Sequence, residues 1–235
     1  MPLLPLASSA LDVDAVLFDA GGTLLRLDYA FMRACAQRRN HAIDDAALAR
    51  GEAVVRREID RREAQTGGTR ERDADRVALY FGAVLESAGV ASAAAAAAAE
   101  EIAAEHSRAN MWRVAIPGAA EVLTALRARG FRVGVVSNAD GRVAALLEAA
   151  GLAPHLETIV DSHLEGVEKP DPEIFRRALA RLTVPAARAA YVGDIFAIDV
   201  LGARAAGLSA ILIDETGGYA DVECPRIAAL AELLG

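Results

Sequence analysis

Four short segments of this sequence carry residues with complementary chemistry. In chain order they hold a candidate nucleophile with a glycine-rich turn, a hydroxyl, a lysine and two further carboxylates: Asp19 to Thr23, Ser137 with Asn138, Lys169 with Pro170, and Gly193, Asp194 and Asp199. Mg²⁺ takes oxygen ligands and usually keeps a phosphate oxygen in its shell. Without a cation, the clustered carboxylates would repel a phosphate dianion by several kcal/mol. The combination therefore predicts a divalent cation and a phosphate in one site.

The lysine stands out against the composition of the chain. Lysine and arginine together number 25, and Lys169 is the only lysine. An ammonium is a compact, strongly hydrated point charge, whereas a guanidinium is a planar fork. We interpret the single lysine as marking a position where the point charge is required.

Apolar segments alternate with helical patterns over most of the chain. Strands are expected at 13–18, 131–137, 158–161, 190–193 and 210–213, and helices at 118–129, 141–150, 172–182 and 198–206, with a short closing helix at 227–234. This alternation predicts βαβ units and a parallel sheet, in a doubly wound, Rossmann-like α/β fold. The chemistry-bearing residues all follow expected strands, and ligands of such sheets bind at the carboxyl ends of strands.

One block between the first strand and the rest has no strand pattern. Apolar residues recur at helical spacing between Val77 and Leu85, and Gly67-Gly68 and Gly89 divide the block into about four helices. Seven consecutive alanines, Ala93 to Ala99, also favour helix. We expect an all-helical domain at 27–113, inserted into an α/β core formed by 1–26 and 114–235.

The composition narrows the classes of partner. The 235 residues are 54% hydrophobic and carry a formal net charge of −8, which argues against nucleic acid and anionic membrane surfaces as partners. No segment reaches the roughly 18 apolar residues of a membrane span. The two cysteines lie far apart, which favours a cytoplasmic protein without disulfides. The sequence does not indicate an oligomeric state.

The four segments together resemble the motifs of the haloacid dehalogenase superfamily of hydrolases, most of which are phosphatases. The resemblance rests on Phe-Asp19-Ala-Gly-Gly-Thr23-Leu, Val-Ser137-Asn, Lys169-Pro-Asp-Pro and Gly193-Asp194-x-x-x-x-Asp199, in this order. It covers nearly the whole chain. It implies that the helical block is the mobile cap of the family, inserted after the first catalytic loop.

The resemblance also implies roles for individual residues. Asp19 is similar to the nucleophile that forms an aspartyl-phosphate, and Lys169 and Thr23 complete the catalytic set. Phosphate binding falls to Ser137, Asn138, Lys169 and the Ala20–Gly21 segment. The implied cofactor is Mg²⁺, held by Asp19, the backbone carbonyl of Gly21 and Asp194, with Asp199 in support.

The sequence departs from the family pattern at Gly21. Phosphatases of the family usually carry a second aspartate two residues after the nucleophile, as a general acid and base, and here that position is Gly21. A positioned acid or base typically contributes about 10²–10⁴ in rate. We therefore expect slow turnover of poor leaving groups, unless a substrate group or a cap residue supplies the proton.

Three functions remain open from the sequence. The leading hypothesis is a Mg²⁺-dependent phosphatase of a small phosphorylated metabolite. A 2-haloacid dehalogenase would need no proton donor, but the resemblance implies a small neutral residue in place of Asp194. A catalytically weak, metal-binding regulatory protein is the third alternative, against which the retained Asp19, Lys169, Asp194 and Asp199 argue.

Overall fold

A computed structural model describes residues 3–6, 9–66 and 74–235. The chain forms two compact units, one of Met1–Arg26 with Val114–Gly235 and one of Leu27–Arg113. The expected break at Gly67-Gly68 lies outside the described residues.

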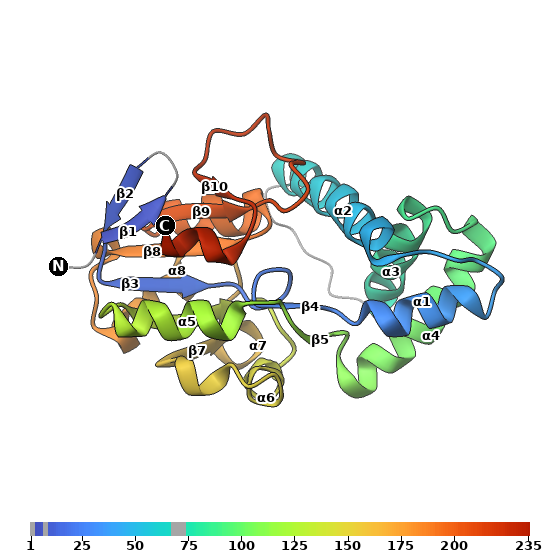
Figure 1. The fold of residues 1–235 in the computed structure, drawn as a ribbon, viewed down its shortest axis with the longest axis horizontal. Coiled ribbons are helices and arrows are strands. Elements are labelled where there is room, and N and C mark those ends of the chain that lie inside the picture. The colour runs from blue at the N-terminus through green and yellow to red at the C-terminus, as the bar shows by residue number, and fades with distance from the viewer. Residues whose placement is uncertain (1–2, 7–8, 67–73) are drawn as a thin grey trace. The chain divides into compact units, whose positions relative to one another are not determined.

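The first unit is built on a six-stranded parallel sheet. Its strands are β3 (Ala15–Phe18), β6 (Arg132–Ser137), β7 (Thr158–Asp161), β8 (Ala189–Gly193), β9 (Ser209–Ile213) and β10 (Arg226–Ile227). They lie in the order β7-β6-β3-β8-β9-β10, and every neighbouring pair is parallel (Figure 1). The chain runs outward from β3 to one edge and then returns to build the other half from β8. This order confirms the doubly wound α/β fold.

Helices connect the strands and cover the sheet. They are α5 (Ala119–Ala128), α6 (Val143–Ala149), α7 (Ser162–Glu165), α8 (Pro172–Leu182) and α9 (Leu201–Ala205), with 3-10 turns η1 (Ala153–His155), η2 (Ala186–Arg188) and η4 (Leu230–Leu234) and a π-helical turn η3 (Phe196–Val200). Helices α8 and α9 pack on the sheet in one apolar cluster with Ala15 and Leu17 of β3. Helix α5 packs against β6, and α6 against β7.

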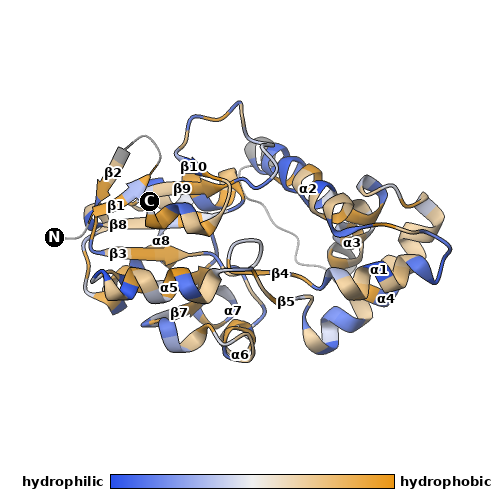
Figure 2. Ribbon diagram, viewed as in Figure 1, coloured by the Kyte–Doolittle hydropathy of each residue, from blue (hydrophilic) through white to orange (hydrophobic). Residues whose placement is uncertain are grey.

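The central strands are apolar because the sheet is buried on both faces. All four residues of β3 and all five of β8 are buried, and Figure 2 shows the strands in hydrophobic colours. Continuous apolar strands of this kind are typical of parallel sheets covered by helices. The sheet gives the loops at its carboxyl edge a rigid base.

The described part of the second unit is helical apart from its connecting loops and its two ends, where Leu27, Trp112 and Arg113 belong to short strands. It consists of α1 (Tyr29–Gln37), α2 (Asp45–Thr66), α3 (Ala74–Ser87) and α4 (Ser92–Ala109). The carboxylate of Asp28 begins α1 by accepting the amide of Phe31 at 2.9 Å. The core includes Phe81 and Leu85 from the predicted stripe on α3 and the small residues Ala95 and Ala98 of α4. Small side chains on α4 let the helices approach closely.

Several short elements were not predicted. Strands β1 (Leu3–Leu6) and β2 (Ser9–Asp12) form an antiparallel hairpin, and β4 (Leu25–Leu27) pairs with β5 (Trp112–Ala115) where the chain passes between the units. The expected closing helix at 227–234 is instead the end of β10 followed by η4, and the expected helix at 198–206 begins as the π-helical turn. Strands β1, β2, β4 and β5 lie outside the apolar segments from which strands were expected. Within the described part of the chain, no helix is long and apolar enough to cross a membrane.

Candidate active site

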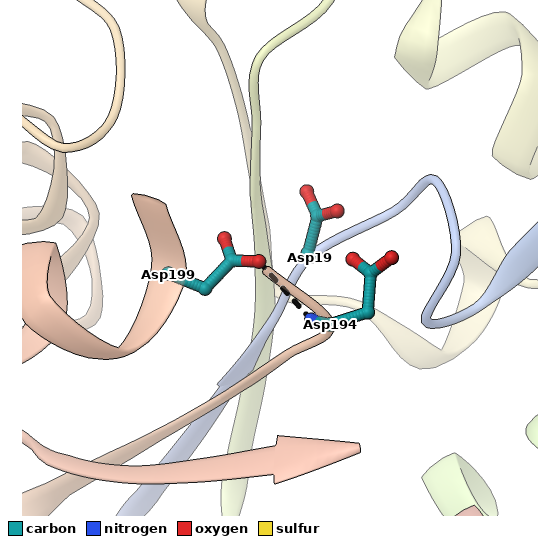
Figure 3. A group of neighbouring side chains, drawn as sticks. All are labelled: Asp19, Asp194 and Asp199. Carbon is teal, nitrogen blue, oxygen red and sulfur yellow. Dashed lines mark hydrogen bonds between the residues drawn. The ribbon is translucent and has the colours of Figure 1, made fainter. Parts of the chain in front are cut away.

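The acidic residues of the candidate site meet where the strand order of the sheet reverses. Strands β3 and β8 are neighbours there, although the segments containing β6 and β7 separate them along the chain. Asp19 follows β3, Asp194 follows β8, and Asp199 lies on η3. One oxygen from each carboxylate lies within 4.8 Å of the others, and Figure 3 shows the three side chains around this point. Ligands of doubly wound sheets bind at this switch point.

Asp19 is buried at the end of β3. Its backbone amide donates to the carbonyl of Val192 at 2.8 Å, which fixes the residue beside β8. Burial is the main cause that raises the pKa of Asp19 to about 6; the charge of Asp199 raises it further, and Lys169 opposes both. Burial makes the charged form of this carboxylate unfavourable unless a positive charge lies beside it. Such a raised pKa is typical of carboxylates that bind a cation or react.

Lys169 lies in the loop between α7 and α8 and is 2% exposed. Its ammonium donates to Oδ1 of Asp19 at 2.7 Å and to Oδ1 of Asp199 at 2.7 Å. Burial lowers the pKa of Lys169, but the two carboxylates outweigh burial and hold the pKa above its usual value. The lysine is therefore charged in this site and neutralises part of the acidic cluster.

Both oxygens of Asp199 are already bonded. Oδ1 accepts from Lys169, and Oδ2 accepts from the backbone amide of Ile195 at 2.9 Å. Oδ2 also accepts from the backbone amide of Asp194 at 3.1 Å, the bond that Figure 3 marks. Gly193 makes this approach feasible, because a Cβ there would lie 2.4 Å from Cγ of Asp199. Asp199 thus holds both the loop after β8 and the lysine. Because its oxygens already accept these hydrogen bonds, we interpret Asp199 as a support of the site rather than as a direct metal ligand.

The turn after Asp19 brings a second glycine against Asp194. Gly22 has a φ of 84°, and a Cβ there would lie 2.2 Å from Oδ2 of Asp194. The carbonyl of Ala20 accepts the amides of Leu24 and Leu25 at 2.9 and 2.8 Å. The carbonyl of Gly21 accepts no hydrogen bond from any residue that the structure describes, which leaves its lone pairs for another ligand.

The segment after β6 meets the lysine loop through Asn138. Its side-chain oxygen accepts the backbone amide of Lys169 at 2.7 Å, and its side-chain nitrogen donates to the Lys169 carbonyl at 2.9 Å. The amide oxygen and one amide N–H thus bond to the lysine backbone, and the phosphate contact of Asn138 stays a prediction. Ser137, the residue before Asn138, is the last residue of β6 and is 5% exposed.

Thr23 is fully buried, and its hydroxyl has no hydrogen-bond partner among the described residues. The sequence grouped Thr23 with the catalytic residues. The structure places it in the turn after Asp19, where the backbone amide of Thr23 donates to Ala20 at 3.4 Å.

Two residues with a place in the site were missed by the sequence analysis. Asp161, at the end of β7, accepts the backbone amides of Gly141, Val143 and His163 at 3.2, 3.3 and 2.9 Å and so supports the loop after Ser137. Tyr191, in the middle of β8, bonds to Lys169. The only sequence signals were an aspartate ending a strand and a hydroxyl inside an apolar one.

The oxygen donors fit Mg²⁺. The carboxylates of Asp19 and Asp194, which are 8% and 3% exposed, and the carbonyl of Gly21 are the hard oxygen ligands that this cation prefers. The cluster holds three buried carboxylates and one ammonium, so it is net negative without a cation. These residues would hold the metal, with Asp199 outside its shell.

The chain belongs to the haloacid dehalogenase-like hydrolase family, whose pattern matches residues 13–207. Among curated relatives, it is 41% identical over 102 residues to the mouse haloacid dehalogenase-like hydrolase domain-containing protein 3, covering 43% of this chain and 40% of the relative. It is 42% identical over 98 residues to a plasmid-encoded phosphoglycolate phosphatase of Cupriavidus necator, covering 41% and 42%. The matches thus span about two fifths of each relative.

Solved structures share the fold over nearly the full length. A phosphatase of the family from Thermococcus onnurineus has a TM-score of 0.59 at 24% identity, covering 94% of this chain and 96% of that one. A dehalogenase with an intermediate complex has a TM-score of 0.62 at 20% identity, covering 95% and 96%. Likeness at this level establishes the fold and does not choose between the two chemistries.

Proposed function

We propose that this protein is a Mg²⁺-dependent phosphatase that acts on a small phosphorylated metabolite through an aspartyl-phosphate intermediate on Asp19. The observation that carries the proposal is the grouping of Asp19, Asp194 and Asp199 at the switch point of the sheet, where the Lys169 ammonium pairs with Asp19 and Asp199. Relatives named phosphoglycolate phosphatase and glyceraldehyde 3-phosphate phosphatase support the same class of reaction.

In the first step, a carboxylate oxygen of Asp19 attacks the phosphorus of the substrate. The new oxygen–phosphorus bond forms as the bond to the leaving oxygen breaks, and that oxygen takes up a proton from water or from an acidic group of the substrate. In the second step, water attacks the phosphorus of the aspartyl-phosphate. Inorganic phosphate leaves, and the Asp19 carboxylate is restored.

The neighbours of Asp19 prepare it for this attack. Lys169 holds one carboxylate oxygen at 2.7 Å, which orients the other, and Asn138 fixes the backbone of Lys169. Ser137 contributes its hydroxyl to phosphoryl binding. Mg²⁺ on Asp19, Asp194 and the Gly21 carbonyl would supply the positive charge that lets a phosphate dianion enter.

We propose that residues 27–113 form a cap that selects the substrate and that Gly21 limits the choice of leaving group. No side chain at Gly21 can protonate a departing alkoxide. Substrates with good leaving groups, or substrates that carry their own acidic group near the leaving oxygen, suit this site. The metabolite itself has to be found by assay.

The net negative charge of the cluster argues against a 2-haloacid as substrate. A 2-haloacid dehalogenase of this family works without a metal, so the haloacid carboxylate would meet this charge uncompensated. At an effective dielectric of about 20, each pair of like charges 4 Å apart costs about 4 kcal/mol. The substrate panel below includes 2-haloacids, so dehalogenase activity would be detected.

The test is a panel of phosphate monoesters and 2-haloacids, each assayed with Mg²⁺ and with EDTA. We expect phosphate release that requires Mg²⁺ and is lost in Asp19→Asn, which keeps the side-chain size and removes the nucleophile. Halide release without metal would replace the phosphatase by a dehalogenase. If purified, folded protein released neither product, the proposed function would be wrong.

A further inference from the structure

Tyr191 bonds to Lys169 of the candidate site and takes no part in the proposed reaction steps. It is fully buried in β8, between β3 and β9, and the edge of its ring packs on Phe175 with ring centroids 5.0 Å apart. A tyrosine hydroxyl at such a depth needs hydrogen-bond partners, because an unpaired buried hydroxyl is costly.

The hydroxyl of Tyr191 meets the lysine and a neighbouring strand. It donates to the backbone carbonyl of Val136 on β6 at 2.9 Å and accepts from Nζ of Lys169 at 2.9 Å. A phenol has one proton, and a carbonyl can only accept, so the proton lies toward Val136. The contact with Oδ1 of Asp199 is longer, at 3.4 Å. Tyr191 therefore presents a lone pair to the ammonium.

This contact completes the hydrogen bonding of Lys169. An ammonium has three N–H donors. They are taken by Asp19 at 2.7 Å, Asp199 at 2.7 Å and Tyr191 at 2.9 Å. The acceptors come from β3, η3 and β8, so the ammonium is held from three directions. None of its donors remains open to another partner.

We propose that Tyr191 is a positioning residue that takes the third N–H of Lys169 and anchors the ammonium to β6, so that Lys169 holds Asp19 in its reactive orientation. The inference rests on the proposed function for its kinetic consequence, but its structural content does not. Val136, which accepts the hydrogen bond of Tyr191, lies one residue before Ser137. Strand β6 therefore positions both the lysine, through Tyr191, and the proposed phosphoryl-binding hydroxyl.

The variant Tyr191→Phe tests the proposal with little change in packing, because the ring that contacts Phe175 stays. It removes the third acceptor and the link to Val136. The freed N–H can turn toward other acceptors, so the ammonium no longer holds one geometry. A hydrogen bond to a charged group is strong enough for its loss to cost about tenfold in turnover.

The matched control is Tyr219→Phe. Tyr219 is 3% exposed and belongs to the same apolar cluster of the first unit as Tyr191. Its hydroxyl is not among the three partners of Lys169. The control therefore measures the general cost of deleting a buried tyrosine hydroxyl in this cluster.

The single lysine permits a direct measurement that needs no activity. Protein labelled with ¹⁵N-lysine gives one side-chain ammonium signal, which belongs to Lys169. We expect slow exchange of its protons with water in the parent and in Tyr219→Phe, and exchange at least about tenfold faster in Tyr191→Phe. Equal exchange in the parent and in Tyr191→Phe would overturn the proposal.

Steady-state kinetics with p-nitrophenyl phosphate and Mg²⁺ provide the second readout. We expect kcat to fall about tenfold in Tyr191→Phe while KM changes less than about twofold, because the ammonium orients Asp19. A rise in KM at unchanged kcat would contradict this role. If the parent turns over no phosphate monoester of the panel, the proposed function fails, whereas the exchange measurement still decides the role of Tyr191.

Discussion

The two adjacent glycines of the first loop allow a sharp test of the missing general acid. The positive φ of this turn falls on Gly22, at 84°, and not on Gly21. A side chain at Gly21 therefore avoids the left-handed strain of about 1–2 kcal/mol that a non-glycine residue meets there. We expect Gly21→Asp to fold and to keep its affinity for Mg²⁺ within about threefold, because the metal-binding atom of Gly21 belongs to the backbone.

The gain expected from Gly21→Asp depends on the leaving group. An alkoxide leaves badly without a proton, so turnover of an alkyl phosphate should rise by about 100-fold, the lower end of the range for a positioned acid. A phenolate with a low pKa leaves unaided, so an aryl phosphate should gain less than about threefold. The assay is the ratio of kcat for glycerol phosphate to kcat for p-nitrophenyl phosphate, in variant and parent.

The neighbouring variant Gly22→Ala is the control. Its Cβ would lie 2.2 Å from Oδ2 of Asp194, in addition to the strain of its φ. Asp194 must then move, and we expect Mg²⁺ affinity to fall at least about tenfold by calorimetry.

An unchanged alkyl-to-aryl ratio in Gly21→Asp, with Mg²⁺ affinity retained, would refute the reasoning that Gly21 is the position of the missing acid.

Further predictions concern the charges of the site and the lysine loop. Lys169→Arg should lose nearly as much kcat as Lys169→Met, because a planar guanidinium cannot reproduce three bonds in this geometry; near-parental turnover would contradict this. Asp194→Asn should weaken Mg²⁺ binding at least tenfold in a calorimetric titration, roughly the cost of one lost carboxylate ligand. Because Asp19 has a raised pKa of about 6, it is protonated below that pH and must lose its proton to bind a cation. Mg²⁺ affinity should therefore be about tenfold lower at pH 5 than at pH 7.5, and Asp19→Asn should remove this pH dependence. Asn138→Ala should lower kcat and leave the Kd of inorganic phosphate unchanged, since its amide group bonds to the Lys169 backbone; a weaker Kd would restore Asn138 as a phosphate ligand.

The sequence predicts the sheet well because its central strands lie in apolar segments that alternate with helical patterns. The apolar segment at 13–18 contains β3, and that at 131–137 contains β6. Strand β10 has two residues, and its apolar Ile227 is indistinguishable from the start of a helix. The hairpin at the N-terminus includes Pro5, which usually argues against a strand and is tolerated only at an edge.

Within the site, the sequence predicts which residues lie close together better than it predicts what each of them binds. The site residues converge because all of them lie in loops or turns at the carboxyl edge of the sheet. These residues are Asp19, Lys169, Asp194 and Asp199. What each does depends on atoms that no spacing specifies. The amide of Asn138 could face a ligand or a backbone, and only the fold decides this, because the Lys169 backbone comes from a distant loop.

The insertion of the helical unit after β3 also has a consequence for the order of folding. Strand β3 pairs with β6 and β8, so the central strand of the sheet must wait for partners that are synthesised long after it. Helix α3 contacts α2 and α4, its neighbours along the chain, and such local contacts form fast. A helical unit that has already collapsed brings its two ends together through the β4–β5 pair, which shortens the loop that β3 must close to reach β6. The inserted unit would then serve the nascent chain as a folding scaffold for the sheet, before any substrate is present.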